Sequence, residues 1–371
     1  MNTPTFSDFD RRAMARALEL ADRGAETTHP NPRVGCVIAR GEQIIAEGWH
    51  ERVGGPHGEA AALQKIPPGT SLAGCTAYVN LEPCSHHGRT PPCADALIAA
   101  RIGRVVYAID DPNPQVAGKG AAALRVAGAS VSSGLMAPEA EEINAGFLMR
   151  MRSGRPFVRV KMGTSLDGRV ALANGKSQWI TGEAARNDVQ RWRARSAAVL
   201  TGIGTVLADN PQLNVRIPGA QRQPLRVILD SELRTPATAR ILDASAPTMI
   251  FTQTGSAAAE AALVAQGVAI ERPKEPRAPI SATVSLPAML SRLGELGINE
   301  VLVEAGPMLS GAFLQCGLAD ELLLYMAPTL LGPQARPLFD LPLLEDLQRA
   351  PRFRIIEQTL IGDDLRLRAA V

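Results

Sequence analysis

The chain has 371 residues, more than one hydrophobic core usually spans, so its length favours two domains. Apolar residues make up 46% and charged residues 20% of the chain, which excludes an intrinsically disordered protein. The net charge of +2 comes from 39 basic and 37 acidic residues scattered along the chain, which argues against nucleic acid as a partner.

The cellular setting follows from the N-terminus and the cysteines. The N-terminus lacks a basic region followed by an apolar run, and no apolar stretch is long enough to cross a membrane. We therefore expect a soluble, cytoplasmic protein without a membrane partner. Five cysteines are too few, and odd in number, for a disulfide framework. They are expected to be metal ligands and buried thiols.

The first half of the chain alternates short helices and strands. Ser7 to Asp10 resembles a capping box, and apolar residues at helical spacing follow as far as Gly24, so a helix opens the chain. Two β-prone runs joined by a Gly41-Glu42 turn predict a hairpin over 34–39 and 43–49. The pattern then predicts helix 60–66, strand 76–81, helix 94–100, strand 104–110 and helix 121–127. This alternation indicates a three-layer α/β domain.

A basic stretch containing Gly154 and Pro156 interrupts the pattern. We place the boundary there, with domains at 1–150 and 151–371. Beyond it, the pattern predicts strands at 157–163, 225–230, 248–251, 301–304 and 322–326, and helices at 183–195 and 288–296. A second α/β domain is therefore expected.

Four residues of the first domain have the types needed for a catalytic zinc site. His57 and Glu59 stand two positions apart at a predicted helix start, and Cys84 and Cys93 each follow a proline. One imidazole and two thiolates make a three-ligand zinc site whose fourth position stays open for water. Bound zinc lowers the pKa of that water to about 7. Glu59 is then expected to shuttle a proton from the water to departing ammonia.

Each of these residues also has an ordinary explanation. His57 could be a surface histidine, Glu59 a solvated helix residue, and the two cysteines buried thiols. Their order and the two prolines together favour the metal site. The remaining cysteines are expected to be structural: Cys36, Cys75 and Cys316.

The spacing of the cysteines departs from the H-x-E…P-C-x-x-C signature of base deaminases, because eight residues separate Cys84 from Cys93. The string EPCSHHGRTPPC at 82–93, with THPNPRVGC at 28–36, resembles the bifunctional riboflavin-biosynthesis deaminase/reductases. The resemblance implies a cytidine-deaminase-like three-layer domain. It also implies that the substrate's pyrimidine ring or ribosyl phosphate is contacted by Asn31, His50 and His86.

From the residues alone these three assignments stay open. Asn31 lies in a His-Pro-Asn-Pro sequence typical of turns, His50 could simply end a strand, and His86 could compete as a metal ligand.

The second domain lacks the dinucleotide fingerprint of a Rossmann fold. Gly202-Ile203-Gly204 is the nearest approach to G-x-G-x-x-G, and it lacks the third glycine. Residues 300–312 instead predict a buried strand, a glycine turn and a helix with Pro307 at its first position. The start of that helix could bind a phosphate, although an ordinary strand-to-helix turn explains it equally well.

Three strings of the second half resemble the reductase domain of the same family, which has a dihydrofolate-reductase-like α/β fold: VKMGTSLDGR at 160–169, SQWITG at 177–182 and TVLADNP at 205–211. The resemblance implies NADPH contacts from Gly163, Trp179, Thr205, Asp209, Ser231, Gly306, Pro307, Met308, Leu309, Ser310, Gly311 and Ala312. It implies substrate contacts from Ser177, Arg193, Leu213, Arg216 and Glu304. Taken singly, Arg193 could be a solvated helix residue and Trp179 a packing residue.

The resemblance implies an enzyme with two activities, one zinc ion per chain and NADPH. It would deaminate 2,5-diamino-6-(5-phosphoribosylamino)pyrimidin-4(3H)-one and then reduce the ribosyl chain, and it would be a homo-oligomer, a dimer or a tetramer. Lys161 and Asp167 are polar candidates for the reduction, without an assigned role.

Two other classes of protein remain open. One is a single-activity nucleobase or RNA deaminase whose C-terminal half only binds. The other is a binding protein with a closed structural zinc, whose fourth ligand would be His86 or His87.

Overall fold

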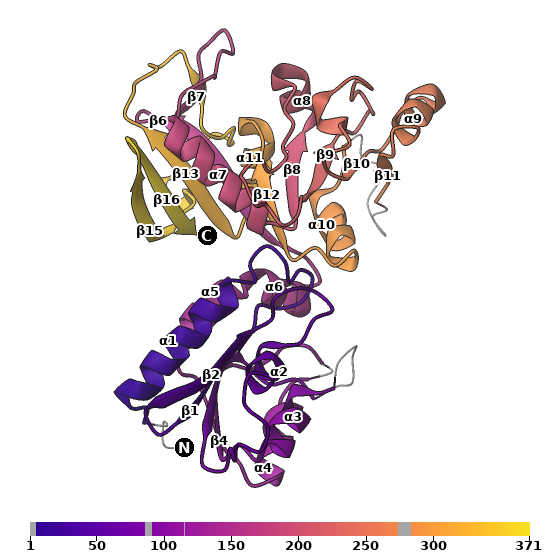
Figure 1. Cartoon of the computed structure of the whole chain (residues 1–371). Coiled ribbons are helices and arrows are strands. Elements are labelled where there is room, and N and C mark those ends of the chain that lie inside the picture. The colour runs from indigo at the N-terminus through magenta and orange to yellow at the C-terminus, as the bar shows by residue number, and fades with distance from the viewer. Residues whose placement is uncertain (1–4, 86–90, 115, 274–282) are drawn as a thin grey trace. The chain divides into compact units, whose positions relative to one another are not determined.

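The computed structural model describes residues 5–85, 91–114, 116–273 and 283–371. It divides into two compact units, unit 1 (Met1–Gly154) and unit 2 (Arg155–Val371) (Figure 1). The boundary expected after residue 150 falls inside α6 (Ala145–Ser153), because that helix continues to Gly154. Gly154 has a φ of 73°, the left-handed conformation with which glycine ends helices.

Unit 1 is a five-stranded mixed sheet with helices on both faces, which confirms the three-layer prediction. Its elements before α6 are α1 (Asp8–Asp22), β1 (Gly35–Arg40), β2 (Gln43–Trp49), α2 (Gly58–Leu63), β3 (Thr76–Leu81), α3 (Cys93–Ala99), β4 (Arg104–Ile109), α4 (Lys119–Val126), β5 (Ser130–Ser133) and α5 (Ala137–Ile143). The strand order is β2-β1-β3-β4-β5, in which β1 is antiparallel to β2 and β3 while the other pairs are parallel. Helices α1 and α5 pack together on the sheet, and α2, α3 and α4 form the other layer (Figure 1).

The start of α1 follows the predicted capping box. The Ser7 hydroxyl accepts a hydrogen bond from the Asp10 amide, and the Asp10 carboxylate accepts one from the Ser7 amide. The buried face of α1 packs on β1 and β3, whose side chains are almost all buried. Strands covered on both faces form a rigid centre, and the turns at their ends carry the residues of the metal site.

Unit 2 is built on a nine-stranded sheet of order β11-β10-β9-β8-β12-β6-β13-β16-β15. Its strands are β6 (Phe157–Ser165), β7 (Arg169–Ala171), β8 (Ala198–Gly202), β9 (Leu225–Leu229), β10 (Thr248–Phe251), β11 (Ala269–Glu271), β12 (Glu300–Glu304), β13 (Glu321–Ala327), β14 (Arg336–Pro337), β15 (Arg354–Ile361) and β16 (Asp364–Ala370). Its helices are α7 (Glu183–Arg195), α8 (Ile203–Asp209), α9 (Ala257–Val264), α10 (Leu286–Glu295) and α11 (Pro307–Gln315), with 3-10 turns η1 (Arg240–Leu242) and η2 (Leu347–Arg349).

The strands of unit 2 from β11 to β13 are parallel, and β16 and β15 complete the sheet antiparallel. One face packs a hydrophobic cluster that includes Val158, Val160 and Met162 of β6, and the other face lies under α7. Because β6, β8, β9 and β12 all run the same way, their carboxyl ends meet at one edge of the sheet, where ligand sites of such sheets lie.

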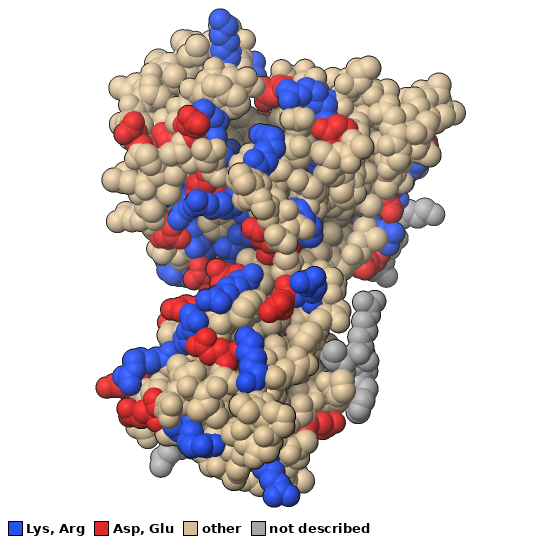
Figure 2. Space-filling view, in the orientation of Figure 1, with Lys and Arg blue, Asp and Glu red and all other residues tan. Residues whose placement is uncertain are grey.

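On the face shown in Figure 2, acidic and basic side chains are interspersed over the described residues of both units. Every helix in the described part of the chain is too short or too polar to span a membrane.

Candidate active sites

The metal site predicted in unit 1 is assembled from three turns. His57 is the residue before α2, Cys93 is the first residue of α3, and Cys84 lies in the turn after β3. The ligand atoms of the three side chains all lie within 4.8 Å of one another. His57 Nδ1 is 3.5 Å from each of the two sulfur atoms. One nitrogen and two sulfur donors at this spacing suit a tetrahedral zinc ion with one position left for water.

Of the two thiols, Cys84 is already polarised toward the ionised state that a metal needs, whereas the hydrogen bond with Cys84 and burial raise the pKa of Cys93. The Cys93 thiol and the His57 imidazole lower the pKa of Cys84 to about 4. The Cys93 backbone amide also donates to Cys84 Sγ at 3.3 Å. A thiolate at this position is the form that binds zinc.

A carboxylate that the motif analysis did not single out anchors the turn that carries Cys84. Glu82 is buried, and it accepts hydrogen bonds from the amides of Gly118 at 3.0 Å and Ala121 at 3.1 Å, at the start of α4. Gly120 leaves room for this contact, since a Cβ there would lie 1.8 Å from the Pro83 oxygen. The sequence signal was available, because Glu82 directly precedes the Pro-Cys pair.

Glu59 projects from the first turn of α2 into the same site. Its side chain is only 2% exposed, and its Oε2 atom has no hydrogen-bond partner among the described residues. Burial, together with the charge on Cys84, raises the pKa of Glu59 to about 7. A buried oxygen without a partner beside three metal ligands leaves a place for a water molecule and thus fits a proton shuttle.

Two of the predicted substrate residues lie beside the metal ligands. The imidazole rings of His50 and His57 meet edge to face, with centroids 5.2 Å apart. His50 Nδ1 lies 2.9 Å from the Pro56 oxygen and must donate there, so a neutral His50 accepts at Nε2 from the Asn31 amide, 3.1 Å away. Burial lowers the pKa of His50, which favours this neutral form.

The other histidines and cysteines of the prediction are placed as follows. His86 and His87 lie outside the residues that the structure describes. Cys36 and Cys75 are fully buried in the core of unit 1, as expected for structural thiols. Cys316 was also expected to be structural, but it is exposed and lines the cavity of unit 2, because it follows the last turn of α11.

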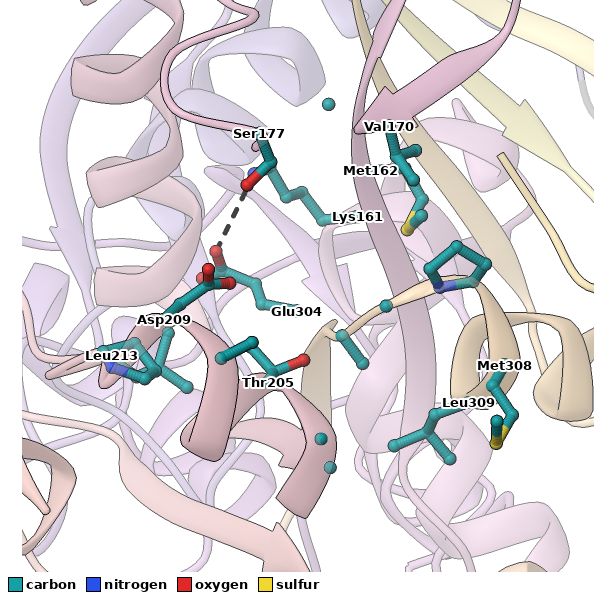
Figure 3. Close-up of a pocket in the computed structure, with 18 of the residues that line it drawn as sticks. Lys161, Met162, Val170, Ser177, Thr205, Asp209, Leu213, Glu304, Met308 and Leu309 are labelled. Atoms are coloured by element: carbon teal, nitrogen blue, oxygen red, sulfur yellow. Dashed lines mark ion pairs between the residues drawn. The ribbon is translucent and has the colours of Figure 1, made fainter. Parts of the chain in front are cut away.

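Unit 2 contains a cavity of about 1480 Å³ at the carboxyl ends of its central strands (Figure 3). The predicted NADPH residues that line it are Gly163, Trp179, Thr205, Asp209, Ser231, Gly306, Pro307, Met308, Leu309 and Ala312. The predicted substrate residues that line it are Ser177, Arg193, Leu213, Arg216 and Glu304. Trp179 is 69% exposed, with the Arg186 guanidinium 4.7 Å from its ring centre, so it is not a packing residue of the core.

Two residues of the predicted NADPH turn do not line this cavity. The Ser310 side chain is buried and donates to Met162 Sδ at 3.2 Å. Gly311 lies against the backbone of Asp340, because a Cβ there would come within 2.2 Å of the Asp340 oxygen. Both therefore serve the packing of α11.

An ion-paired cluster forms one wall of the cavity. Arg193 holds Glu304 with two hydrogen bonds, Nε to Oε1 at 2.5 Å and Nη2 to Oε2 at 3.0 Å. Lys161 Nζ lies 3.8 Å from the same carboxylate (dashed line in Figure 3). Burial alone would raise the pKa of Glu304, but Arg193 and Lys161 lower it. Burial lowers the pKa of Lys161, against the opposing effect of Glu304.

Lys161 and Asp167 were the two candidates without an assigned role, and they lie in different surroundings. Lys161 lines the cavity. Asp167 instead holds a turn, since its carboxylate accepts from the Ser165 hydroxyl at 2.5 Å and from the Gly332 amide at 2.7 Å. We infer a structural role for Asp167.

Comparison with known proteins matches each unit to a family profile. Residues 7–109 match the family profile described as cytidine and deoxycytidylate deaminase zinc-binding region. Residues 156–367 match the profile described as RibD C-terminal domain. The fold and the two sites thus define a zinc-binding deaminase joined to an NADPH-dependent reductase.

Relatives match over nearly the whole chain. The riboflavin biosynthesis protein RibD of Escherichia coli (strain K12) is 49% identical over 96% of this chain and 98% of its own length. RibD of Bacillus amyloliquefaciens is 43% identical over 96% of this chain and 95% of its own length. A structure of Acinetobacter baumannii RibD superposes with a TM-score of 0.88 at 46% identity, covering 98% of both chains.

A structure from Thermotoga maritima covers 98% of both chains with a TM-score of 0.84 at 33% identity. That protein is a diaminohydroxyphosphoribosylaminopyrimidine deaminase/5-amino-6-(5-phosphoribosylamino)uracil reductase.

This chain belongs to the RibD family of bifunctional riboflavin biosynthesis proteins. It is a hydrolase in its deaminase reaction and an oxidoreductase in its reductase reaction. The match across both units favours two activities over a single-activity deaminase with a binding-only C-terminal half.

Proposed function

We propose that unit 1 hydrolyses the ring amino group of 2,5-diamino-6-(5-phosphoribosylamino)pyrimidin-4(3H)-one, and that unit 2 reduces the ribosyl chain of the product to ribityl. The observation that carries the proposal is the meeting of His57, Cys84 and Cys93 with Glu59, whose Oε2 atom has no partner among the described residues, in one site. The Thermotoga maritima relative, whose name includes a phosphoribosylaminopyrimidine substrate, supports the choice of substrate class.

In unit 1 we assign His57, Cys84 and Cys93 as the zinc ligands. Zinc, when bound, supplies a Lewis acid that makes water nucleophilic at neutral pH. Glu59 then takes one proton from the attacking water and passes it to the leaving nitrogen. The carbon–nitrogen bond breaks, a carbon–oxygen bond replaces it, and ammonia departs. Neutral His50, held by Asn31, orients the ring beside the ligands.

In unit 2 the cavity is large enough to hold a dinucleotide and a sugar phosphate together, since typical small-molecule pockets reach about 1,000 Å³. We assign the cofactor to the wall formed by Gly306 to Leu309 at the start of α11, whose free backbone amides would bind its phosphate groups. NADPH, when bound, supplies the hydride. Lys161 holds a proton at Nζ inside the cavity, and we assign it as the proton source, with Glu304 and Arg193 fixing its position.

The test supplies zinc-loaded protein with the diaminopyrimidine ribosyl phosphate, with and without NADPH. Ammonia release is expected in both cases, and loss of NADPH absorbance only when the cofactor and the deaminated product are present together. Ammonia release without any NADPH oxidation would overturn the second half of the proposal. The absence of both reactions from zinc-loaded, folded protein would overturn all of it.

We further propose a homo-oligomer, a dimer or a tetramer, in the cytoplasm. The edge strand β15 exposes apolar side chains, Ile355 at 61% and Leu360 at 73%, and open apolar edges of this kind are usually covered. Light scattering of the full chain tests the assembly, and a monomeric mass would contradict it. A reducing compartment suits the five free cysteines.

A further inference from the structure

Three arginines line one corner of the unit 2 cavity, and they differ in their hydrogen-bond partners. Arg193, Arg216 and Arg240 all line the cavity. The Arg193 guanidinium holds Glu304 with two nitrogens and donates to the Asn214 backbone oxygen with the third, at 3.2 Å. Three of its five N–H donors are thus used inside the protein, and its charge is paired with Glu304. The corner therefore presents the charges of Arg216 and Arg240.

Arg216 is oriented by Asn214. Its Nη1 donates to Asn214 Oδ1 at 2.6 Å, and its backbone amide donates to Gln190 Oε1 at 3.0 Å. Burial and the nearby charges of Arg193 and Arg240 lower the pKa of Arg216, against the opposing effect of Glu304. Arg216 and Arg240 are both exposed where they line the cavity, and cations that repel one another favour binding of an anion.

Arg240, which the sequence motifs did not single out, is held by the same loop. Its backbone amide donates to Asn210 Oδ1 at 2.8 Å, and its Nη2 donates to Gln212 Oε1 at 3.0 Å. The Gln212 amide in turn donates to Asp243 Oδ2 at 3.1 Å, which fixes the direction of its carbonyl. The side-chain amides of Asn210, Gln212 and Asn214 thus position the two arginines.

The backbone of this loop adopts a conformation that non-glycine residues rarely take. Asn210, with a φ of 41°, is the left-handed residue that ends α8, a position that asparagine accepts readily, so the unusual residue is Leu213, with a φ of 49°. Left-handed backbone at a residue such as leucine is strained, and strain of this kind concentrates at ligand sites. Leu213 lies beside Asp209 on the cavity wall (Figure 3).

Within the described part of the chain, neither arginine of this corner has a carboxylate of its own. Neither Arg216 nor Arg240 forms an ion pair within 4.0 Å with a carboxylate of the described residues, since Arg193 and Lys161 share Glu304 and Arg226 takes Asp243. Two placed guanidinium groups without a carboxylate match the charge and fork geometry of a phosphate monoester.

We propose that Arg240 binds the phosphate group of the reductase substrate together with Arg216, and that Gln212 is the residue that positions Arg240. The inference rests on the proposed function, because it takes a ribosyl phosphate as the substrate of unit 2. In this proposal Arg193 holds Glu304 and does not bind the phosphate.

The test compares reduction of 5-amino-6-(5-phosphoribosylamino)uracil with reduction of the same compound lacking phosphate, in the full-length zinc-loaded protein. Arg240→Ala should raise KM for the phosphorylated substrate about tenfold, the usual scale of one charge-assisted contact, and leave kcat within about twofold. KM for the dephosphorylated substrate should not change. Gln212→Leu should shift KM in the same direction by less, and Arg240→Lys should recover part of the loss.

Arg234→Ala is the matched control, because Arg234 is exposed, pairs with Glu232 at 3.4 Å and does not line the cavity. It should leave both KM values unchanged. Competitive inhibition by ribose 5-phosphate gives a second measurement, and it should weaken about tenfold in Arg240→Ala. Equal KM changes for both substrates, or none, would overturn the inference. A wild-type protein that oxidises NADPH with neither substrate would instead overturn the proposed function.

Discussion

The two active regions of this chain are built in opposite ways. The metal site of unit 1 gathers three ligands and one carboxylate from a 37-residue stretch, His57 to Cys93, and packs them within one buried cluster. The cavity of unit 2 draws its wall from residues between Lys161 and Asp340, over several strands and their turns. A compact site depends on each of a few side chains, whereas a dispersed cavity depends on the whole sheet. Substitutions should therefore separate the two activities cleanly.

The largest effect is expected from removing zinc. A chelator should abolish ammonia release and leave NADPH oxidation with the deaminated substrate intact, because the three ligands all belong to unit 1. Adding Zn²⁺ should restore ammonia release. Metal analysis should find about one zinc per chain, also in a Cys75→Ala variant, whose thiol lies in the core. Equal loss of both reactions on chelation would show that the two regions are not independent.

Glu59→Gln should have the next largest effect. The amide keeps the size of the side chain but cannot carry a proton between water and ammonia, so ammonia release should fall about a thousandfold. Zinc content and NADPH oxidation with the deaminated substrate should match the wild type. Normal deamination by this variant would refute the shuttle role, and loss of zinc would assign Glu59 to the metal.

Arg193→Ala should act on unit 2 alone. It leaves Glu304 buried with Lys161 as its remaining partner at 3.8 Å, and removing one partner of a buried pair costs about 3–5 kcal/mol. NADPH oxidation should fall about a hundredfold while ammonia release stays unchanged. Arg191→Ala, on the exposed face of the same helix, is the control and should match the wild type. If both variants lose reduction equally, the effect comes from α7 as a helix and not from the ion pair.

The difference between a compact site and a dispersed cavity also explains which residues could be predicted from the sequence. The zinc ligands follow from residue types and spacing, because an imidazole, two Pro-Cys thiols and a neighbouring carboxylate have few other joint uses. Glu82 was missed because a carboxylate that binds helix amides looks like any other acidic residue until α4 is placed beside it. The three-layer fold of unit 1 follows from its alternating pattern.

In unit 2 the residue pattern predicted strands but could not bring them together. Neighbouring parallel strands pair residues that are far apart in the sequence, so local periodicity does not predict the order of the strands. The cavity residues were predicted through family resemblance. The resemblance included Ser310 and Gly311 with their neighbours, although both lie toward the interior of the unit. Arg240 was missed because only the folded loop at 210–216 brings it to the cavity.

The smallest effect concerns acid stability of unit 1, away from its metal site. Burial alone would raise the pKa of Asp10, but Arg104, Tyr78 and the Ser7 amide lower it from 3.8 to about 2. The carboxylate therefore stabilises the fold above pH 3.8, and this stabilisation, about 2 kcal/mol, is lost as the pH falls toward 2.

Asp10→Asn should lower the free energy of unfolding of unit 1 by about 1–2 kcal/mol at pH 7, and by progressively less between pH 4 and pH 2, where the wild-type carboxylate also becomes neutral. Urea unfolding of the full chain at several pH values, followed by Trp49 fluorescence in variants lacking the tryptophans of unit 2, measures this. Asp8→Asn, an exposed residue of the same helix turn, should change the unfolding free energy by a few tenths of a kcal/mol at most. A loss that stays constant down to pH 2 would show that Asp10 acts through its shape and hydrogen bonds, because its charge would then contribute nothing.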